Sequence, residues 1–348
     1  MTITVGINGF GRIGRCTLMH IAESAREDIK VVKLNATGPL ETAAHLVRYD
    51  SVHGRFRNEV TTGDNWIDLG RGQIEVMSTY NMDELDWSGV DVVLECTGQF
   101  NDGNKAKAHL ERGAKSVLIS APAKNVQKTI VMGVNDDQLR PGDVMISNGS
   151  CTTNCLAPLA KVLDHEIGIE SGIMTTIHSY TGDQPTLDRR HADLYRARAA
   201  AMAMIPTSTG AAKALGEVLP QLKGKLDGSA IRVPTPNVSA VDLTFVAKKS
   251  VTVEEVNAVI AEAAALKMQG IMGFDAAPKV SIDFNHTEES SIFAPDQTKV
   301  TGGRLVRVLA WYDNEWGFSC RMADVAVAMG RQLHAKLDPL EALGHEMA

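Results

Sequence analysis

The sequence predicts an α/β protein of two domains, in which a parallel sheet is followed by a largely antiparallel one. Its 348 residues exceed one ordinary hydrophobic core and suit two domains of typical size. In the first half, short β-branched runs alternate with helix-like stretches, which is typical of a parallel sheet covered by helices. After about residue 150 the apolar runs are longer and partly alternating, which favours an antiparallel sheet with one covered face.

The individual elements follow from these patterns. The strands expected in the first half are residues 3–7, 30–34, 90–95, 116–120, 129–133 and 144–147, and the helices are 11–24 and 104–113. The strands expected in the second half are residues 173–180, 238–248 and 304–313. Residues 181–209 are rich in arginine and histidine and follow neither period, so we expect a long loop, which is usually functional.

Residues 1–149 are predicted to form the first domain, completed by a terminal helix at about residues 316–335. Residues 150–315 form the second domain, and residues 336–348 are expected to be a loosely attached tail.

Composition limits the classes of function. The formal net charge of −7 argues against nucleic-acid binding and against an anionic membrane surface. No apolar run approaches the roughly 20 residues of a membrane-spanning helix, and the N-terminus does not resemble a signal peptide. Five cysteines without paired spacing favour the reducing cytoplasm over a disulfide framework. We therefore expect a cytoplasmic protein with a small-molecule site.

A glycine-rich motif follows the first expected strand. Gly9, Phe10, Gly11, Arg12, Ile13 and Gly14 form a G-x-G-x-x-G pattern that opens a helix. Gly9 permits the tight turn, Gly11 lets a pyrophosphate approach the backbone, and Gly14 allows close packing of helix and strand. The motif in this context predicts a Rossmann-type dinucleotide-binding domain, although a bare glycine pattern is often only a loop.

The end of the second expected strand lacks the acid that usually binds the adenosine ribose. The sequence there is Asn35, Ala36, Thr37 and Gly38, without a carboxylate. An acid would repel a 2′-phosphate, so its absence removes a barrier to NADP. The alternative is that Ala36 only weakens NAD binding.

A cysteine and a histidine form a candidate nucleophilic pair. Cys151 follows a strand and precedes a helical pattern, so it is expected at a helix N-terminus, where the dipole favours thiolate. His178 lies in a later strand that would return beside it, giving an activated nucleophile. A buried structural cysteine and a packed histidine are the alternatives. We expect no metal site, because neither C-x-x-C nor H-E-x-x-H spacing occurs.

Six motifs in colinear order resemble the glyceraldehyde-3-phosphate dehydrogenase family. They are residues 7–15, 49–54, 150–155, 206–213, 232–237 and 311–317. The resemblance covers the chain from Thr2 to about Gly330.

The resemblance implies phosphorylating oxidation of glyceraldehyde 3-phosphate to 1,3-bisphosphoglycerate, in glycolysis or gluconeogenesis. Cys151 would be the nucleophile that forms a thioester, and His178 would be the base. Hydride would pass to NADP or NAD, and inorganic phosphate would release the acyl phosphate. The backbone N–H of Cys151 is expected to help stabilise the oxyanion.

The resemblance also implies two phosphate sites and a cofactor groove. The residues expected to bind substrate or inorganic phosphate are Ser150, Thr152, Thr181, Asp183, Arg196, Thr209, Gly210 and Arg232. Those expected to bind the cofactor are Gly9, Phe10, Gly11, Arg12, Ile13, Asn35, Ala36, Thr37, Thr97, Ser120, Arg189, Arg190 and Asn314.

Two departures from the common family pattern predict a preference for NADP over NAD. One is Ala36, where NAD-dependent members have aspartate. The other is the pair Arg189 and Arg190 in the long loop, where the common pattern is Leu-Pro. In the family this loop reaches the cofactor of a neighbouring subunit, which also implies a homotetramer.

Two alternative functions stay open from sequence alone. The first is an erythrose-4-phosphate dehydrogenase, a relative with the same fold and nucleophile. The second is a redox-sensing or nucleic-acid-binding protein that has kept this fold, since a reactive Cys151 can be oxidised.

Overall fold

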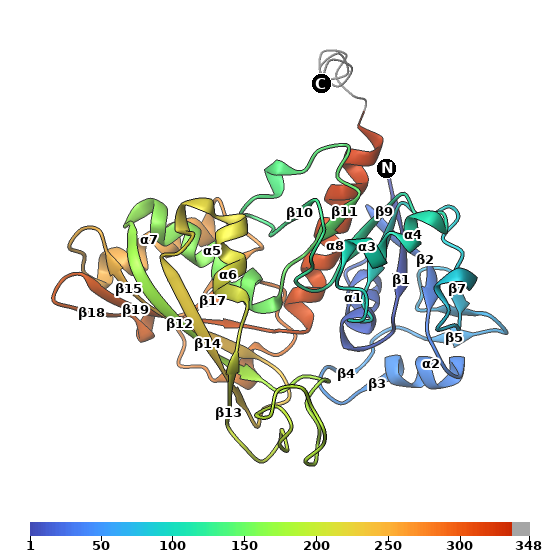
Figure 1. Cartoon of the computed structure of the whole chain (residues 1–348), viewed down its shortest axis with the longest axis horizontal. Helices are drawn as coiled ribbons and strands as arrows, with labels where there is room; N and C mark the ends of the chain where they lie inside the picture. The colour runs from blue at the N-terminus through green and yellow to red at the C-terminus, as the bar shows by residue number, and fades with distance from the viewer. Residues whose placement is uncertain (336–348) are drawn as a thin grey trace.

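The computed structural model describes residues 1–335 and contains two large sheets, with the terminal helix lying between them (Figure 1). The predicted tail, residues 336–348, lies outside the described residues. The first sheet has the strand order β10-β11-β9-β8-β1-β2-β7-β6-β5. Its strands are β1 (Ile3–Asn8), β2 (Ile29–Asn35), β5 (Thr61–Thr62), β6 (Trp66–Asp68), β7 (Ile74–Met77), β8 (Val92–Glu95), β9 (Ser116–Ile119), β10 (Lys128–Thr129) and β11 (Met145–Ser147). Every pair from β10 to β7 is parallel, which confirms the predicted parallel sheet.

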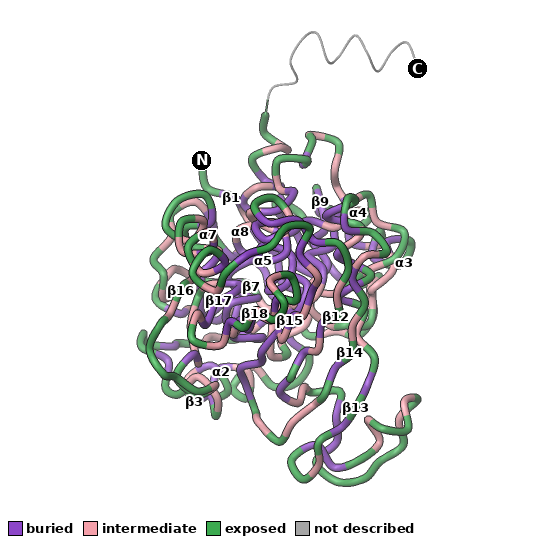
Figure 2. Tube along the Cα trace, turned by 90° about the vertical axis from the view of Figure 1, so that its left-hand side faces the viewer, coloured by how far each residue is buried: buried purple, intermediate pink, exposed green. Residues whose placement is uncertain are grey.

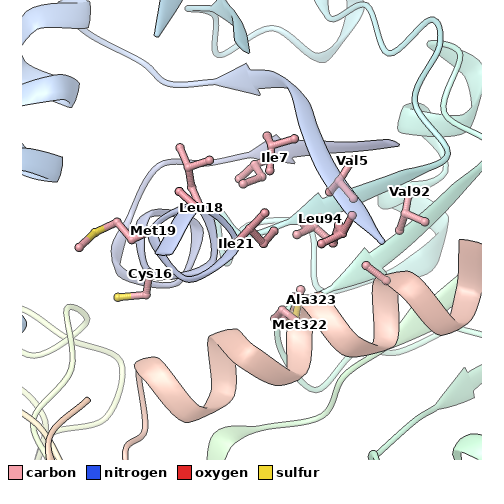
Figure 3. Packing of buried hydrophobic residues seen from close by; sticks show 14 of the residues in the cluster. Val5, Ile7, Cys16, Leu18, Met19, Ile21, Val92, Leu94, Met322 and Ala323 are labelled. Atoms are coloured by element: carbon pink, nitrogen blue, oxygen red, sulfur yellow. The ribbon is translucent and has the colours of Figure 1, made fainter. Parts of the chain in front are cut away.

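Two helices from opposite ends of the sequence cover this sheet together. Helix α1 (Arg12–Glu23) packs against α8 (Trp316–His334), and α8 also contacts β1, β8 and β9. Figure 3 shows Ile21 of α1 beside Leu94 of β8, with Met322 of α8 nearby in the same core. At Gly330 an added Cβ would lie 2.4 Å from the Ile3 side chain, so glycine allows this close approach. The last helix therefore packs on the first sheet.

The remaining elements of the first half are short. They are α2 (Leu40–Arg48), β3 (Tyr49–Asp50), β4 (Gly54–Arg55), α3 (Gly103–Ala106), α4 (Ala108–Glu111) and two 3-10 turns at Met82–Glu84 and Asp136–Gln138. Three further 3-10 turns, at Pro220–Leu222, Ser281–Phe284 and Pro295–Gln297, lie in the second half. Strands β3 and β4 pair only with each other.

The second sheet has the order β13-β14-β12-β15-β19-β17-β16, with β18 beside β19. Its strands are β12 (Ile169–Ser179), β13 (Ile205–Ser208), β14 (Leu226–Val233), β15 (Ser239–Ala247), β16 (Met272–Phe274), β17 (Ser291–Phe293), β18 (Lys299–Thr301) and β19 (Leu305–Tyr312). Only the β12–β14 and β16–β17 pairs are parallel, so the sheet is largely antiparallel, as predicted.

One face of the second sheet is covered and the other is open. Helices α5 (Cys151–Glu166), α6 (Ala211–Val218) and α7 (Val253–Ala265) bury side chains such as Met174 and Phe245. On the opposite face Ile173 is 64% exposed and Ile177 is 39% exposed. This alternation follows from the two-residue period of a strand.

Three predicted boundaries were wrong. The strand expected at 129–133 ends at Thr129, because the Asn135 side chain accepts a hydrogen bond from the backbone N–H of Val131 and closes a turn. The helix expected at 104–113 consists of α3 and α4, which meet at Lys107. The loop expected at 181–209 ends earlier, because Ile205–Ser208 pairs with β14 as β13. Figure 2 shows the loop projecting beyond β13, with mostly exposed or half-buried residues.

Candidate active site

The structure brings Cys151 and His178 together. Cys151 is the first residue of α5, and the Ser150 hydroxyl caps the helix by accepting a hydrogen bond from Thr153 N at 3.0 Å. His178 is near the end of β12, and its Nε2 lies 3.5 Å from Sγ of Cys151. A thiol at a helix N-terminus next to an imidazole is the arrangement of an activated nucleophile.

The orientation of the imidazole is fixed by its other nitrogen. Nδ1 of His178 lies 2.7 Å from the carbonyl oxygen of Ser179, and a carbonyl only accepts, so Nδ1 carries the proton. Burial, reinforced by the charge of Arg232, lowers the pKa of His178 to about 3. The ring is therefore neutral at pH 7, and the bare Nε2 faces the sulfur and can accept its proton.

Burial and nearby groups shift the pKa of the Cys151 thiol in opposite directions. Burial raises the pKa of Cys151, while the positive charge of Arg232 and hydrogen bonds from Thr152 lower it. The Cys151 residue as a whole is half-buried. A neutral thiol beside a neutral imidazole is a resting pair in which the proton can move to His178 when the sulfur attacks.

Arg232 lies beside the pair because of the strand register. His178 of β12 is the direct neighbour of Arg232 on the parallel strand β14. The Arg232 guanidinium donates to Thr181 Oγ1 at 2.9 Å and to the carbonyl of Ser179 at 3.1 Å. Its buried Nε has no partner among the described residues. The group thus keeps hydrogen-bonding capacity for an anion.

A second guanidinium stands close by. Arg196 donates to Asp183 at 3.0 Å and to Thr207 at 3.0 Å, and its Nη2 lies 3.4 Å from the carbonyl of Ser208. Thr209 and Gly210 follow directly, at the start of α6. Thr181 and Asp183 link the two guanidinium groups, because Thr181 Oγ1 accepts from Arg232 and donates to Asp183, which accepts from Arg196. Adjacent guanidinium groups are suited to phosphate.

The glycine motif borders a separate cavity of about 290 Å³ at the carboxyl ends of the first sheet's central strands. It is lined by Asn8, Gly9, Phe10, Gly11, Asn35, Thr37, Thr79, Tyr80, Met82, Leu85, Cys96, Thr97, Gln99 and Phe100. Gly9 has φ +95°, and a Cβ on Gly14 would lie 2.1 Å from the Gly9 carbonyl. A Cβ on Gly11 would meet no atom within 4 Å, so this backbone is open to a ligand. The three glycines have the geometry expected of a pyrophosphate-binding loop.

Several predicted cofactor residues lie outside the lining of this cavity. Ala36 is buried beside it, and Ile13, Ser120 and Asn314 are also outside the lining. The Arg12 side chain is also outside the lining and forms ion pairs with Asp50 and Glu315. Arg189 and Arg190 are exposed on the long loop, so within one chain they do not reach the cavity.

Comparisons with known proteins agree with this geometry. The family description "Glyceraldehyde 3-phosphate dehydrogenase, NAD binding domain" matches residues 3–103, and the corresponding C-terminal domain matches residues 150–314. Glyceraldehyde-3-phosphate dehydrogenase of Cereibacter sphaeroides is 64% identical over 96% of this chain and 100% of its own length. The Xanthobacter flavus protein is 62% identical over 95% of this chain and 99% of its own, and the chromosomal Cupriavidus necator protein is 55% identical over 94% and 99%. The chain belongs to the glyceraldehyde-3-phosphate dehydrogenase family.

Family membership confirms the resemblance inferred from the six motifs and the two-part α/β fold. Nothing in the comparisons favours the erythrose-4-phosphate alternative. Within residues 1–335, the structure has no helix that is both long and apolar enough to cross a bilayer.

Two positioning contacts of this family member were not predicted. The Tyr312 hydroxyl lies 2.8 Å from both Thr152 Oγ1 and Thr176 Oγ1, and so joins the start of α5 to β12. Thr152, predicted to bind phosphate, therefore has its hydroxyl engaged by Tyr312. Asn314 is held by the hydroxyls of Ser179 and Ser239, at 2.8 and 2.9 Å. The 311–317 motif contains Tyr312, but its sequence does not reveal a hydroxyl partner.

Arg12 belongs to a largely buried ionic network that joins the starts of α1 and α8 to β3. It donates to Asp50, at 2.5 and 3.0 Å, and to Glu315, at 2.9 and 2.5 Å. The ligand-type atoms of Cys16, His53 and Glu315 lie within 4.8 Å of one another. Because Glu315 already pairs with Arg12 and His53, the group is satisfied as an ion network. The Arg12 side chain thus has a structural role within the chain, and its part in cofactor binding stays a prediction.

Asp50→Asn is expected to destabilise the protein by about 1–3 kcal/mol at pH 7, because it removes one charge from a pair with a 1%-exposed carboxylate. Burial opposes the charged form, but hydrogen bonds from Arg12 and from the backbone of His53 and Val52 lower the pKa of Asp50 to about 2. The stabilisation is therefore present above about pH 4 and is lost as the pH falls toward 2.

Urea unfolding at pH 7 and at pH 3 measures this dependence. The difference between wild type and D50N should shrink at pH 3, and the exposed control D64N should match the wild type at both. A difference that stays constant with pH would contradict the role given to the Asp50 charge.

Proposed function

We propose that this protein catalyses the phosphorylating oxidation of glyceraldehyde 3-phosphate to 1,3-bisphosphoglycerate through a thioester on Cys151. The observation that carries the proposal is the 3.5 Å approach of Sγ and the bare Nε2 of His178 at the N-terminus of α5. The names of the relatives from Cereibacter sphaeroides and Xanthobacter flavus support the same substrate.

The chemistry begins with attack of Sγ on the aldehyde carbon. His178 Nε2 accepts the thiol proton and returns it to the new oxygen, which gives a hemithioacetal. His178 then takes the hydroxyl proton while hydride departs, leaving a thioester on Cys151. A dinucleotide bound by the glycine loop supplies the hydride acceptor. Attack of hydrogen phosphate on the thioester carbon breaks the C–S bond and releases the acyl phosphate. The protonated His178 returns its proton to the sulfur, and the proton of the phosphate passes to solvent.

The substrate phosphate and the attacking inorganic phosphate each need a binding site near Sγ of Cys151. We assign the substrate phosphate to Arg232, Thr181 and Asp183, and the attacking phosphate to Arg196. Ser150, Thr209 and Gly210 complete the second site. The hydrogen-bonded link between the two guanidinium groups through Thr181 and Asp183 supports this assignment. The backbone N–H of Cys151 is assigned to the oxyanion, as suits a helix N-terminus.

Initial rates with glyceraldehyde 3-phosphate test this activity. Reduction of dinucleotide that requires inorganic phosphate is expected, together with slower or no turnover of erythrose 4-phosphate. Equal or faster turnover of erythrose 4-phosphate would favour that alternative. Absence of reduction with either aldehyde would remove the enzymatic proposal.

We propose NADP as the preferred hydride acceptor and NAD as the less favoured one. The support is the missing acid at Ala36 and the two cations Arg189 and Arg190 on an exposed loop. Because these arginines lie outside the cavity of their own chain, they would meet the 2′-phosphate in a neighbouring subunit. The proposal therefore requires an oligomer.

Replacing both Arg189 and Arg190 with leucine is expected to lower kcat/KM for NADP by about tenfold or more and to leave that for NAD within about twofold. One charge-assisted hydrogen bond to a phosphate accounts for an effect of this size. Initial rates with both dinucleotides measure the ratio. Arg331→Leu, an exposed arginine on α8, is the control. A parallel fall with NAD and NADP would contradict a 2′-phosphate contact.

The oligomeric state, the domain boundaries and the cellular location are also proposals. The long loop exposes large apolar side chains, among them Leu194 at 82% and Met202 at 81%, which supports burial in a homotetramer. We place the dinucleotide-binding domain at residues 1–149 with α8, and the catalytic domain at residues 150–315. The free thiols of all five cysteines support a reducing cytoplasm.

A further inference from the structure

A buried carboxylate lies behind the dinucleotide cavity and is not used in the mechanism above. Glu95 ends β8 and is 0% exposed. The two residues that follow it, Cys96 and Thr97, line the cavity. A fully buried carboxylate costs free energy unless its oxygens are fully hydrogen-bonded, so its partners indicate what it does.

Glu95 receives hydrogen bonds from four donors. Oε2 accepts from Asn8 Nδ2 at 2.7 Å and from His109 Nε2 at 2.9 Å. Oε1 accepts from the backbone N–H of Thr97 at 2.8 Å and from its hydroxyl. A carboxylate accepts at both oxygens, whereas a glutamine presents an NH2 group at one of them. A glutamine here would place two donors against each other.

The side of Glu95 away from the cavity is fixed by His109 and Trp87. The Trp87 indole can only donate, and its Nε1 lies 2.9 Å from Nδ1 of His109. Nδ1 therefore accepts, and the ring proton is on Nε2, directed at Glu95. Both rings are 0% exposed, so this arrangement cannot relax toward solvent.

The side toward the cavity continues through two asparagines. Asn8 Oδ1 accepts from Asn35 Nδ2 at 2.8 Å. Asn35 in turn binds both backbone groups of Thr79, accepting from its N–H at 3.1 Å and donating to its carbonyl at 3.0 Å. The chain of contacts thus joins the ends of β8, β1 and β2 to the segment after β7. All four cavity residues in it, Asn8, Asn35, Thr79 and Thr97, belong to the lining.

We propose that Glu95 is a positioning residue that sets the shape of the adenosine half of the dinucleotide cavity. This rests on the proposed dinucleotide site. The adenosine half is assigned because the cavity lies between the glycine loop and the end of β2, where the adenosine ribose of a dinucleotide binds. Apolar side chains such as Leu85 and Phe100 offer the surfaces an adenine ring needs. Cys151 and His178 are not part of this lining.

The test compares E95Q with wild type and with E111Q, whose side chain is 63% exposed on α4. The probe is ADP-ribose, which carries the adenosine half and the pyrophosphate but no nicotinamide. For E95Q we expect its Kd, measured by calorimetry, and the KM for dinucleotide to rise about tenfold or more. The kcat at saturating dinucleotide and the alkylation rate of Cys151 by iodoacetamide should stay within about twofold. E111Q should match wild type throughout.

Each of the other outcomes contradicts a part of the proposal. An unchanged Kd for ADP-ribose in a folded E95Q variant overturns the positioning role. Comparable falls in the kcat at saturating dinucleotide and in the alkylation rate of Cys151 also overturn it. If the wild type itself fails to bind ADP-ribose, the proposed dinucleotide site is wrong, and the inference falls with it. If E95Q does not fold, Trp87→Phe decides, since it removes the indole donor behind His109, together with part of a buried ring, and leaves Glu95 in place. W87F should raise the Kd about threefold, and no change would contradict the proposal.

Discussion

Cys151→Ser is expected to lower kcat by a factor on the order of 10⁴ or more, while dinucleotide binding stays within about twofold. A serine hydroxyl is a far weaker nucleophile than a thiol, and the resulting oxygen ester would discharge differently to phosphate. The cavity of the glycine motif does not include Cys151, so cofactor affinity should not depend on it.

Cys155→Ser is the matched control for this variant. Cys155 lies one turn later in α5, is 0% exposed, and contacts Ser291 at 3.5 Å. It should keep most of the activity. Comparable losses in C151S and C155S would indicate a general effect on α5 and contradict the assignment of Cys151 as nucleophile.

His178→Asn is the second large effect, with an expected fall in kcat of about 10²- to 10⁴-fold. Asparagine fills much of the same volume but cannot take up the proton at the Nε2 position. Alkylation of Cys151 by iodoacetamide at pH 7 should also slow, because the thiol loses its nearest proton acceptor. Stopped-flow reduction of dinucleotide and mass-spectrometric alkylation rates measure the two effects.

The control for H178N is His165→Asn on the exposed surface of α5, where the side chain is 74% exposed. It should behave as wild type. A kcat for H178N within about fivefold of wild type would show that another group accepts the proton.

The site residues were predictable from the sequence where their geometry depends only on residues close to them in the chain. Gly9, Gly11 and Gly14 act within one turn and one helix, so their spacing determined their roles. Cys151 was placed at a helix start for the same local reason. Its contact with His178 depends on how β12 packs against α5, and the expected return of that strand predicted the pair but not its 3.5 Å separation.

Contacts between distant segments were not predictable in this way. Arg12 follows the second glycine of the motif, yet its partners Asp50 and Glu315 lie 38 and 303 residues away. The contact between the Thr152 hydroxyl and the Tyr312 hydroxyl joins residues 160 positions apart, and the phosphate-binding role of Thr152 stays a prediction. Such pairings depend on tertiary packing that no local pattern encodes.

The secondary structure also contains elements that were predictable from local pattern and elements that were not. Long apolar strands such as β1, β12, β15 and β19 were predicted within a few residues. The two- and three-residue strands β5 and β6 were not, because so short a run carries no measurable period. Helices α6 and α7 were also missed, and α7 has a clear capping box at Thr252 and Glu255 that could have revealed it.

The central claim, a thioester on Cys151, is tested most directly by the intact mass of the protein after mixing with glyceraldehyde 3-phosphate and dinucleotide without inorganic phosphate. We expect one added phosphoglyceroyl group per chain, located on Cys151 by peptide mapping, and its loss when inorganic phosphate is supplied. An unmodified Cys151 in protein that has reduced one equivalent of dinucleotide would contradict the account.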